Sequence, residues 1–70
     1  MGVGGARRLT NSRNAVVLDT LAVSYFSADR VDEAIRTGRA AVDLAVAGND
    51  AAMAERFRLR LRLYEDAAKR

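Results

Sequence analysis

Residues 18–41 of this chain, LDTLAVSYFSADRVDEAIRTGRAA, decide its fold. Their apolar residues recur at intervals of three and four, which is the spacing that lines one side of an α-helix. In the first half the repeating positions are Leu18, Leu21, Ala22 and Tyr25. In the second half, which continues past the quoted stretch, they are Val31, Ala34, Ile35, Gly38, Ala41, Val42 and Ala45. The pattern predicts two amphipathic helices joined by a tight turn at residues 27–30.

The ends of these helices are predicted from capping residues. Asn14 is a suitable N-cap for a first helix over residues 14–28, and Asp29 is suitable for a second helix over residues 30–47. Gly48 is a natural stop for that second helix.

A third helix is expected over residues 51–68, with Asp50 as its cap. One side of it carries Met53, Phe57, Leu61 and Tyr64. The segment RFRLRLRL within it also alternates with a period of two, which is typical of a strand. Its alanine-rich flanks favour a helix, and a single strand would have no partner. The fold class predicted is therefore all-α, a helical hairpin with a third packed C-terminal helix.

Residues 1–13 leave two interpretations open. They are rich in Gly and Arg and then in Thr, Asn and Ser, which suits a flexible basic tail. The segment ARRLT at residues 6–10 also suits the last turn of a helix that began upstream. Residues 14–70 are expected to form a single domain.

The composition excludes several kinds of site. The chain has 70 residues and contains no Cys and no His, so it lacks thiolate ligands, disulfides and the usual acid–base group at neutral pH. No nucleophile–base pair or set of metal ligands is visible, so we expect no catalytic residue, no metal and no cofactor. No uncharged run approaches the roughly 20 residues of a membrane span. The first residues do not resemble a signal peptide, and we expect a cytoplasmic protein that is not an enzyme.

The formal net charge of +3 is unevenly distributed. Arg7, Arg8 and Arg13 lie at the N-terminus, residues 14–50 hold more acids than bases, and residues 51–70 hold more bases than acids. The acidic hairpin and the basic last segment should attract each other. Binding of a nucleic acid by the arginines of the last helix is the alternative.

The quoted stretch resembles a tetratricopeptide repeat. The pattern of that repeat is W-x-x-L-G-x-x-Y, followed by A-x-x-x-F and a terminal P. This chain departs from it with Leu18 for the Trp, Ala22 for the Gly, Gly38 for the Phe and Val46 for the Pro. The resemblance implies that these residues pack the repeat: Leu18, Leu21, Ala22, Tyr25, Ala34, Gly38 and Ala41.

The wider pattern resembles the C-terminal end of a bacterial repeat array. NAVVLDTLA at residues 14–22 is similar to the opening N-P-x-x-L-D-T-L-A of such repeats, with Ala15 in place of Pro. RLRLY at residues 60–64 is similar to a closing helix. This implies a remnant of a preceding repeat before residue 14, one complete repeat and a terminal helix.

A protein of this family is expected to be a non-catalytic scaffold that binds a protein or peptide. The surface that corresponds to the family's groove offers Val16, Asp19, Thr20, Val23 and Phe26. It is apolar with one acid, which favours an apolar peptide or a second copy of the chain, most simply in a dimer. Burial of Val23 and Phe26 within the chain is the alternative. We expect no specific binding of nucleic acid and no membrane partner.

Overall fold

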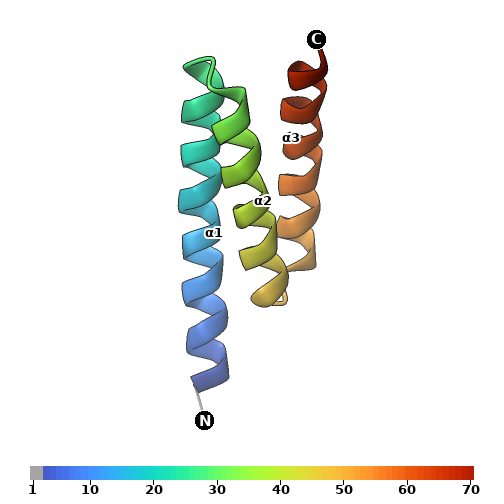
Figure 1. Ribbon diagram of the computed structural model, residues 1–70. Coiled ribbons are helices and arrows are strands. Elements are labelled where there is room, and N and C mark those ends of the chain that lie inside the picture. Colours follow the sequence, from blue (N-terminus) through green and yellow to red (C-terminus); the bar gives the residue numbers. More distant parts are fainter. Residues whose placement is uncertain (1–2) are drawn as a thin grey trace.

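A computed structural model describes residues 3–70, with side chains from Arg13 onward, and contains three helices and no strand in that part of the chain. They are α1 (Val3–Ser27), α2 (Val31–Ala47) and α3 (Ala51–Lys69). Successive helices run in opposite directions (Figure 1), and the molecule measures 49 × 18 × 12 Å. The predicted all-α hairpin with a packed third helix is confirmed.

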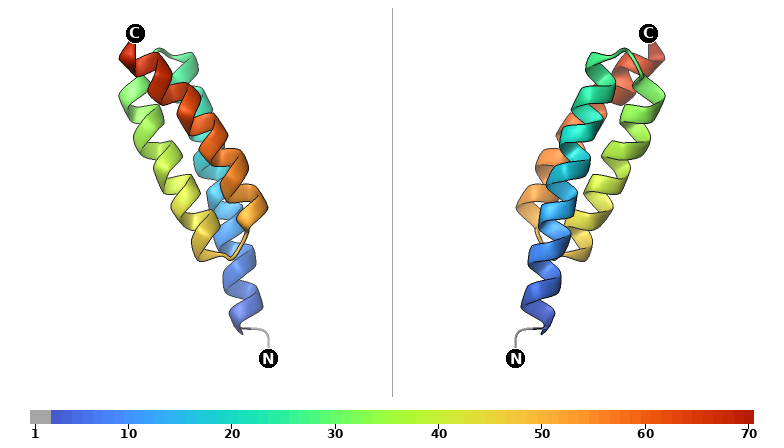
Figure 2. Two further views of the ribbon diagram at one scale, coloured as in Figure 1. Left: turned by 90° about the vertical axis from the view of Figure 1, so that its right-hand side faces the viewer. Right: turned by 90° about the vertical axis from the view of Figure 1, so that its left-hand side faces the viewer.

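The helices pack mainly on their neighbours in the sequence. α1 packs on α2, and α2 packs on α3, whereas α1 and α3 meet at fewer points. In Figure 2, α3 crosses in front of α1 in the left view and α1 crosses in front of α3 in the right view, with α2 beside both. This arrangement gives α1 and α3 a shared surface.

The predicted start of the first helix at Asn14 is wrong. α1 begins at Val3, and Asn14 lies in its interior, so residues 3–13, for which a flexible tail and a helix remnant were both open, are helical and continuous with the rest of α1. No proline interrupts residues 3–13, and Ala, Arg and Leu within them are good helix formers, so nothing ends the helix there. The N-terminal turns of α1 extend past the end of α2 in Figure 1. Met1 and Gly2 lie outside the described residues.

Both connections between helices use the same local geometry. Asp29 and Asn49 have positive φ angles of 66° and 62°. The amide of the next residue then reaches back five positions, from Arg30 to the Tyr25 carbonyl and from Asp50 to the Ala45 carbonyl, at 2.8 and 2.9 Å. This is the bond of a Schellman turn, whose left-handed residue is usually Gly and sometimes Asn.

The structure corrects one predicted cap and confirms another. Arg30, not Asp29, is the N-cap of α2, and it makes no side-chain capping bond, because Asp29 occupies the left-handed position of the turn. Asp50 caps α3 as predicted, since its carboxylate accepts a hydrogen bond of 3.1 Å from the Met53 amide. α2 ends directly before Gly48, as predicted, although Asn49 and not the glycine takes the positive φ.

The core is built largely from alanine. Every apolar residue that is at most 1% exposed is an alanine, and larger buried residues retain 3–8% exposure. One cluster lies toward the α2–α3 turn and consists of Ala15, Ala41, Val42, Ala45, Ala54 and Phe57. A second lies toward the α1–α2 turn and consists of Ala22, Ala34 and Tyr64. Leu61 packs against both clusters.

Gly38 of α2 lies directly against side chains of α3. A Cβ atom added there would stand 3.2 Å from Leu61 Cδ1 and 3.6 Å from the Tyr64 ring. The space beside Gly38 is thus filled by side chains of α3. Small residues on α2 allow both neighbouring helices to pack closely against it.

Ala34→Leu and Ala41→Leu should each lower the free energy of unfolding by about 1–3 kcal/mol, because an enlarged side chain overpacks a closed crossing. Both alanines have 0% exposure. Chemical denaturation followed by circular dichroism measures the change. Ala52→Leu, at an exposed position of α3, is the matched control and should unfold like the parent. Unchanged stability in both core variants would contradict the packing described here.

Candidate protein-binding face

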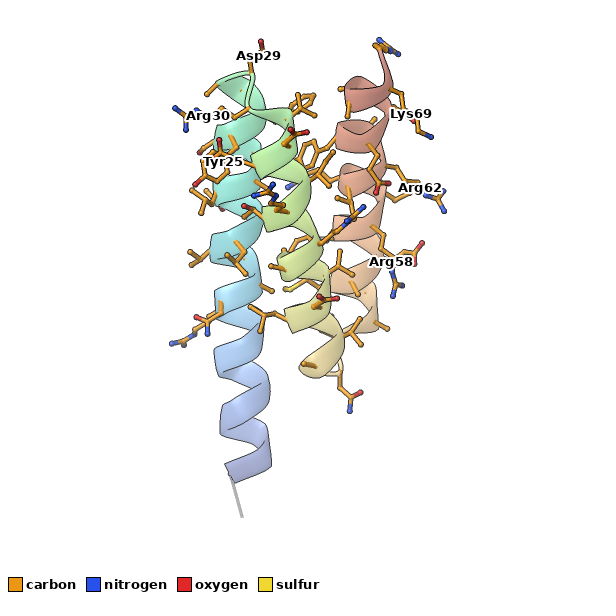
Figure 3. All side chains as sticks on the ribbon, viewed as in Figure 1. Tyr25, Asp29, Arg30, Arg58, Arg62 and Lys69 are labelled. Atoms are coloured by element: carbon orange, nitrogen blue, oxygen red, sulfur yellow. The ribbon has the colours of Figure 1, made fainter. Side chains whose placement is uncertain are left out.

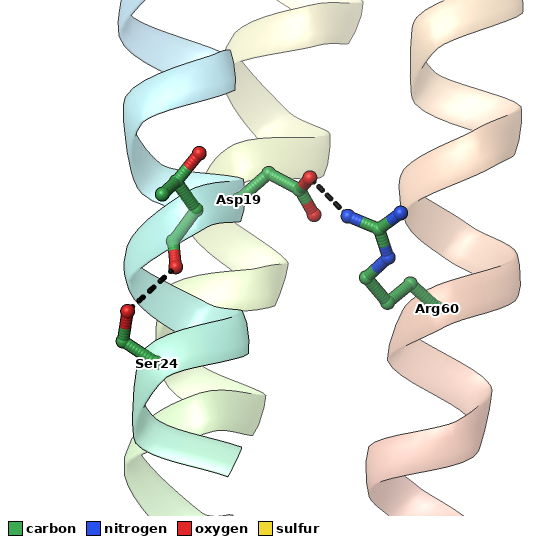
Figure 4. A network of polar contacts seen from close by, with 4 residues as sticks. Asp19, Ser24 and Arg60 are labelled. Carbon is green, nitrogen blue, oxygen red and sulfur yellow. Dashed lines mark hydrogen bonds and ion pairs between the residues drawn. The ribbon is translucent and has the colours of Figure 1, made fainter. Parts of the chain in front are cut away.

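Two contacts bridge α1 and α3 on the surface that they share. Arg60 of α3 donates a hydrogen bond to the Asp19 carboxylate of α1 (Figure 4). Nearer the α1–α2 turn, the rings of Phe26 and Tyr64 pack with centroids 4.8 Å apart and planes inclined by 36°. We call the surface around these bridges the α1/α3 face.

The Asp19–Arg60 pair joins the acidic hairpin to the basic last helix. It is the kind of attraction that the charge distribution predicts. Arg39 of α2 and Glu65 of α3 form a second inter-helix ion pair, at 3.4 Å. In this pair the hairpin supplies the base and α3 supplies the acid. The Arg60 side chain is 45% exposed and that of Asp19 15%, so water screens the pair in part. The pair orients α3 against α1 and contributes little to stability.

Phe26 is partly used within the chain. Its ring packs on Tyr64 and remains 37% exposed, so it contributes less to a free binding surface than its sequence position suggests. Val16 and Val23 are 46% and 40% exposed, and Thr20 is exposed as well. Of the five residues predicted for the groove, these three face solvent, and Asp19 forms an ion pair with Arg60.

Two shallow depressions lie on or beside this face. One, of about 380 Å³, is lined by Arg13, Val16, Val17 and Met53, and so spans α1 and the start of α3. The other, of about 570 Å³, is lined by Arg56, Leu59, Arg60 and Leu63 of α3.

Sequence reasoning did not assign the α3 residues to the binding face. The signal was present, because Leu59 and Leu63 are four residues apart and lie off the apolar side of α3 that packs on α2.

Most of the predicted packing residues are buried as expected. Ala22, Ala34, Gly38 and Ala41 lie in the core, and Leu18 and Tyr25 pack against it. Leu21 is 41% exposed, so it is less buried than the other predicted packing residues. α2 covers only one side of α1, and Leu21 lies on another, one turn from the exposed Val17.

The Tyr64 hydroxyl is buried without a hydrogen-bond partner among the described residues. Burial raises the pKa of Tyr64 above 10.0, the Asp19 carboxylate raises it further, and the Arg60 guanidinium lowers it. An unpaired buried hydroxyl costs about 1–3 kcal/mol. Tyr64 therefore supplies packing surface, and its oxygen opposes folding.

The described residues show neither a metal-binding cluster nor a membrane-spanning helix. No group of three or more His, Cys, Asp or Glu in the described part of the chain is arranged to hold a metal ion. Among the same residues, no helix is both long and apolar enough to cross a membrane. The chemistry that remains on the α1/α3 face is apolar contact and charge pairing.

Tyr64→Phe should raise the free energy of unfolding by about 1 kcal/mol, because it removes the unpaired hydroxyl and keeps the ring. The pKa of Tyr64 is higher in the folded chain, so the parent should lose stability relative to the variant as pH rises above 10.0. Denaturation at neutral and alkaline pH measures both effects. A variant less stable than the parent at neutral pH would show that the hydroxyl has a partner.

The chain matches no family model, no curated protein and no solved structure. What it does must be inferred from the geometry of the face itself.

Proposed function

We propose that this chain is a non-catalytic protein-binding module of the tetratricopeptide type, the C-terminal repeat and closing helix of a bacterial-type array, acting in the cytoplasm. The observation that carries the proposal is the exposure of apolar side chains along α1 on two of its sides. Val16 and Val23 lie on one side of α1, and Val17 and Leu21 lie about 100° or more around the helix axis from them, all four exposed. A helix that is apolar on more than one side is usually covered on more than one side.

The charges on α1 support this interpretation. Within residues 14–27 the only charged residue is Asp19, and that carboxylate is paired with Arg60. On the exposed surface of this segment, only hydroxyl and amide groups are therefore left to be hydrated. Exposed apolar surface of this kind marks interaction sites.

The same surface suits a protein, a peptide or a second copy of the chain. One repeat has only α3 as a neighbour within the described residues, and repeat units bury their apolar faces against adjoining units. A symmetric dimer is the simplest way to cover α1 in the isolated chain.

The parent chain should associate in solution, and Val16→Lys combined with Val23→Lys should shift it to monomers. Two lysines on an apolar interface would have to be desolvated on association, which disfavours the dimer. Sedimentation equilibrium at several concentrations measures the mass. Val46→Lys, at an exposed position of α2, is the control and should leave association unchanged. A parent that stays monomeric at the highest concentrations would contradict self-association.

Nucleic-acid binding is the second candidate, and one observation favours it. Arg58, Arg62 and Lys69 point away from the other two helices in Figure 3. Against it, Arg58 pairs with Glu55 at 3.8 Å, and Asp66 lies on the same exposed surface of α3 as Arg62. The arginines of the RFRLRLRL segment divide between two sides of α3, so they form no single basic stripe.

The chain should therefore not bind DNA or RNA with sequence dependence at about 150 mM salt, because the side chains that the structure describes form no array of cations that matches a phosphate backbone. Fluorescence anisotropy with labelled duplexes and single strands of several sequences tests this. Binding of every sequence alike that disappears as salt rises would reflect the net positive charge alone. Tight binding to one sequence that persists at this salt would favour the second candidate.

A further inference from the structure

The most exposed large apolar side chains of α3 form a pair that nothing in the described chain covers. Leu59 and Leu63 are 56% and 63% exposed and lie one helical turn apart. Leu61, between them in the sequence, packs in the core, so the pair lies on a separate side of the helix. We call Leu59 and Leu63 the leucine pair.

Two arginines border the leucine pair within one depression of about 570 Å³. Arg60 is compensated by Asp19 across the α1/α3 face. Arg56 makes no ion pair with any described residue, whereas Arg58 on the other side of α3 pairs with Glu55. The depression thus combines an apolar centre with one uncompensated positive charge.

We propose that this depression binds an amphipathic helix of another protein, in which carboxylates adjoin apolar side chains. The inference rests on the proposed function and names the chemistry of the partner. Apolar residues spaced one turn apart would cover the leucine pair, as in other helix-in-groove interfaces. A Glu or Asp beside them would meet Arg56, where charge complementarity selects the partner and its orientation.

A second copy of this chain is a poor occupant of the depression. In an antiparallel pair of α3 helices, Arg56 would lie against Arg56 or Arg60 of the other copy, which is repulsive. The exposed apolar side chains of α1 have no free carboxylate beside them, because Asp19 is paired with Arg60. Self-association through α1 and partner binding through α3 therefore use different residues.

An anionic membrane or a nucleic acid is also disfavoured. Glu55 lies one turn before Leu59, and Asp66 lies one turn after Leu63, both exposed. A surface of uniform negative charge would meet these two carboxylates as well as the arginines. A folded helix can place its acids against Arg56 alone.

Three matched peptides of about 16 residues test the proposal. Each carries leucines one turn apart on an alanine-rich helix, flanked by Glu in the first, Gln in the second and Lys in the third. Binding to the full chain is measured by fluorescence anisotropy at low and high salt. The Glu peptide should bind most tightly, and its affinity should fall as salt rises.

Variants of the chain locate the site. Arg56→Glu should weaken binding of the Glu peptide by about tenfold and strengthen that of the Lys peptide. Arg36→Glu makes the same change of charge on α2, at an exposed residue outside the depression. It should change the affinity of the Glu peptide and that of the Lys peptide by no more than about twofold. Leu59→Ser with Leu63→Ser should abolish binding of all three peptides and leave the thermal melt unchanged, because both side chains are exposed.

The possible outcomes separate the inference from the function on which it rests. Equal binding of the Glu and Gln peptides would overturn the acidic partner and leave a protein-binding module. Binding of none of them, together with a parent that is monomeric, would overturn both. Displacement of the Glu peptide by phosphatidylserine vesicles or by poly(U), lost in Arg56→Glu, would assign the depression to an anionic surface instead.

Discussion

The close approach of three helices at small residues on α2 is the constraint on which this structure depends. Ala34, Gly38, Ala41 and Ala45 face the core from α2, and a larger side chain at any of them would separate α2 from a neighbour. The alanines that are fully buried contribute little apolar area each. Tyr64, Phe57 and Leu61 of α3 supply the bulk that α2 lacks. Stability in this chain therefore comes from closeness of packing more than from the size of its core.

The hydrophobic spacing was sufficient to predict the helices, their order and most of the core. Periods of three and four residues decide which residues of a helix share a side, and the two breaks at residues 28–30 and 48–50 fall where the spacing stops.

Helix ends were predicted less well, because they depend on backbone geometry. Asp29 has the side chain of an N-cap, but the turn requires a residue at positive φ, and Asp29 is placed there. The start of α1 was misjudged because Asn14 can cap a helix and can equally lie inside one.

The α1 residues of the candidate site could be predicted from the sequence, and the α3 residues could not. Val16 and Val23 were assigned to the face from their positions on α1, and the structure leaves them exposed. Leu21 was predicted to pack within the repeat. Spacing alone does not show how much of the circumference of α1 the neighbouring helix covers. The contributions of α3 depend on how that helix is rotated against α2. That rotation is set by contacts such as Gly38 with Leu61, between residues far apart in the sequence.

The alternation of Arg and Leu along α3 has a different meaning on a helix than it has in the sequence. Residues two apart are separated by about 200° around the helix axis, so the arginines divide between two sides. Arg56 and Arg60 lie beside the leucine pair, while Arg58 and Arg62 point away from the other helices. The basic run thus gives α3 two different sides. On one side Arg58 and Arg62 lie among acidic residues, and on the other Arg56 and Arg60 border exposed leucines.

The packing of each helix chiefly on its neighbour in the sequence also bears on how the chain folds. α1 on α2 and α2 on α3 are contacts of short sequence separation, so little loop-closure entropy is lost before they form. Chains dominated by such local contacts fold in about microseconds to milliseconds. Two short turns of the same geometry leave few alternative ways to connect the helices. The exposed apolar sides of α1 and α3 would accordingly be in place as soon as the helices pack.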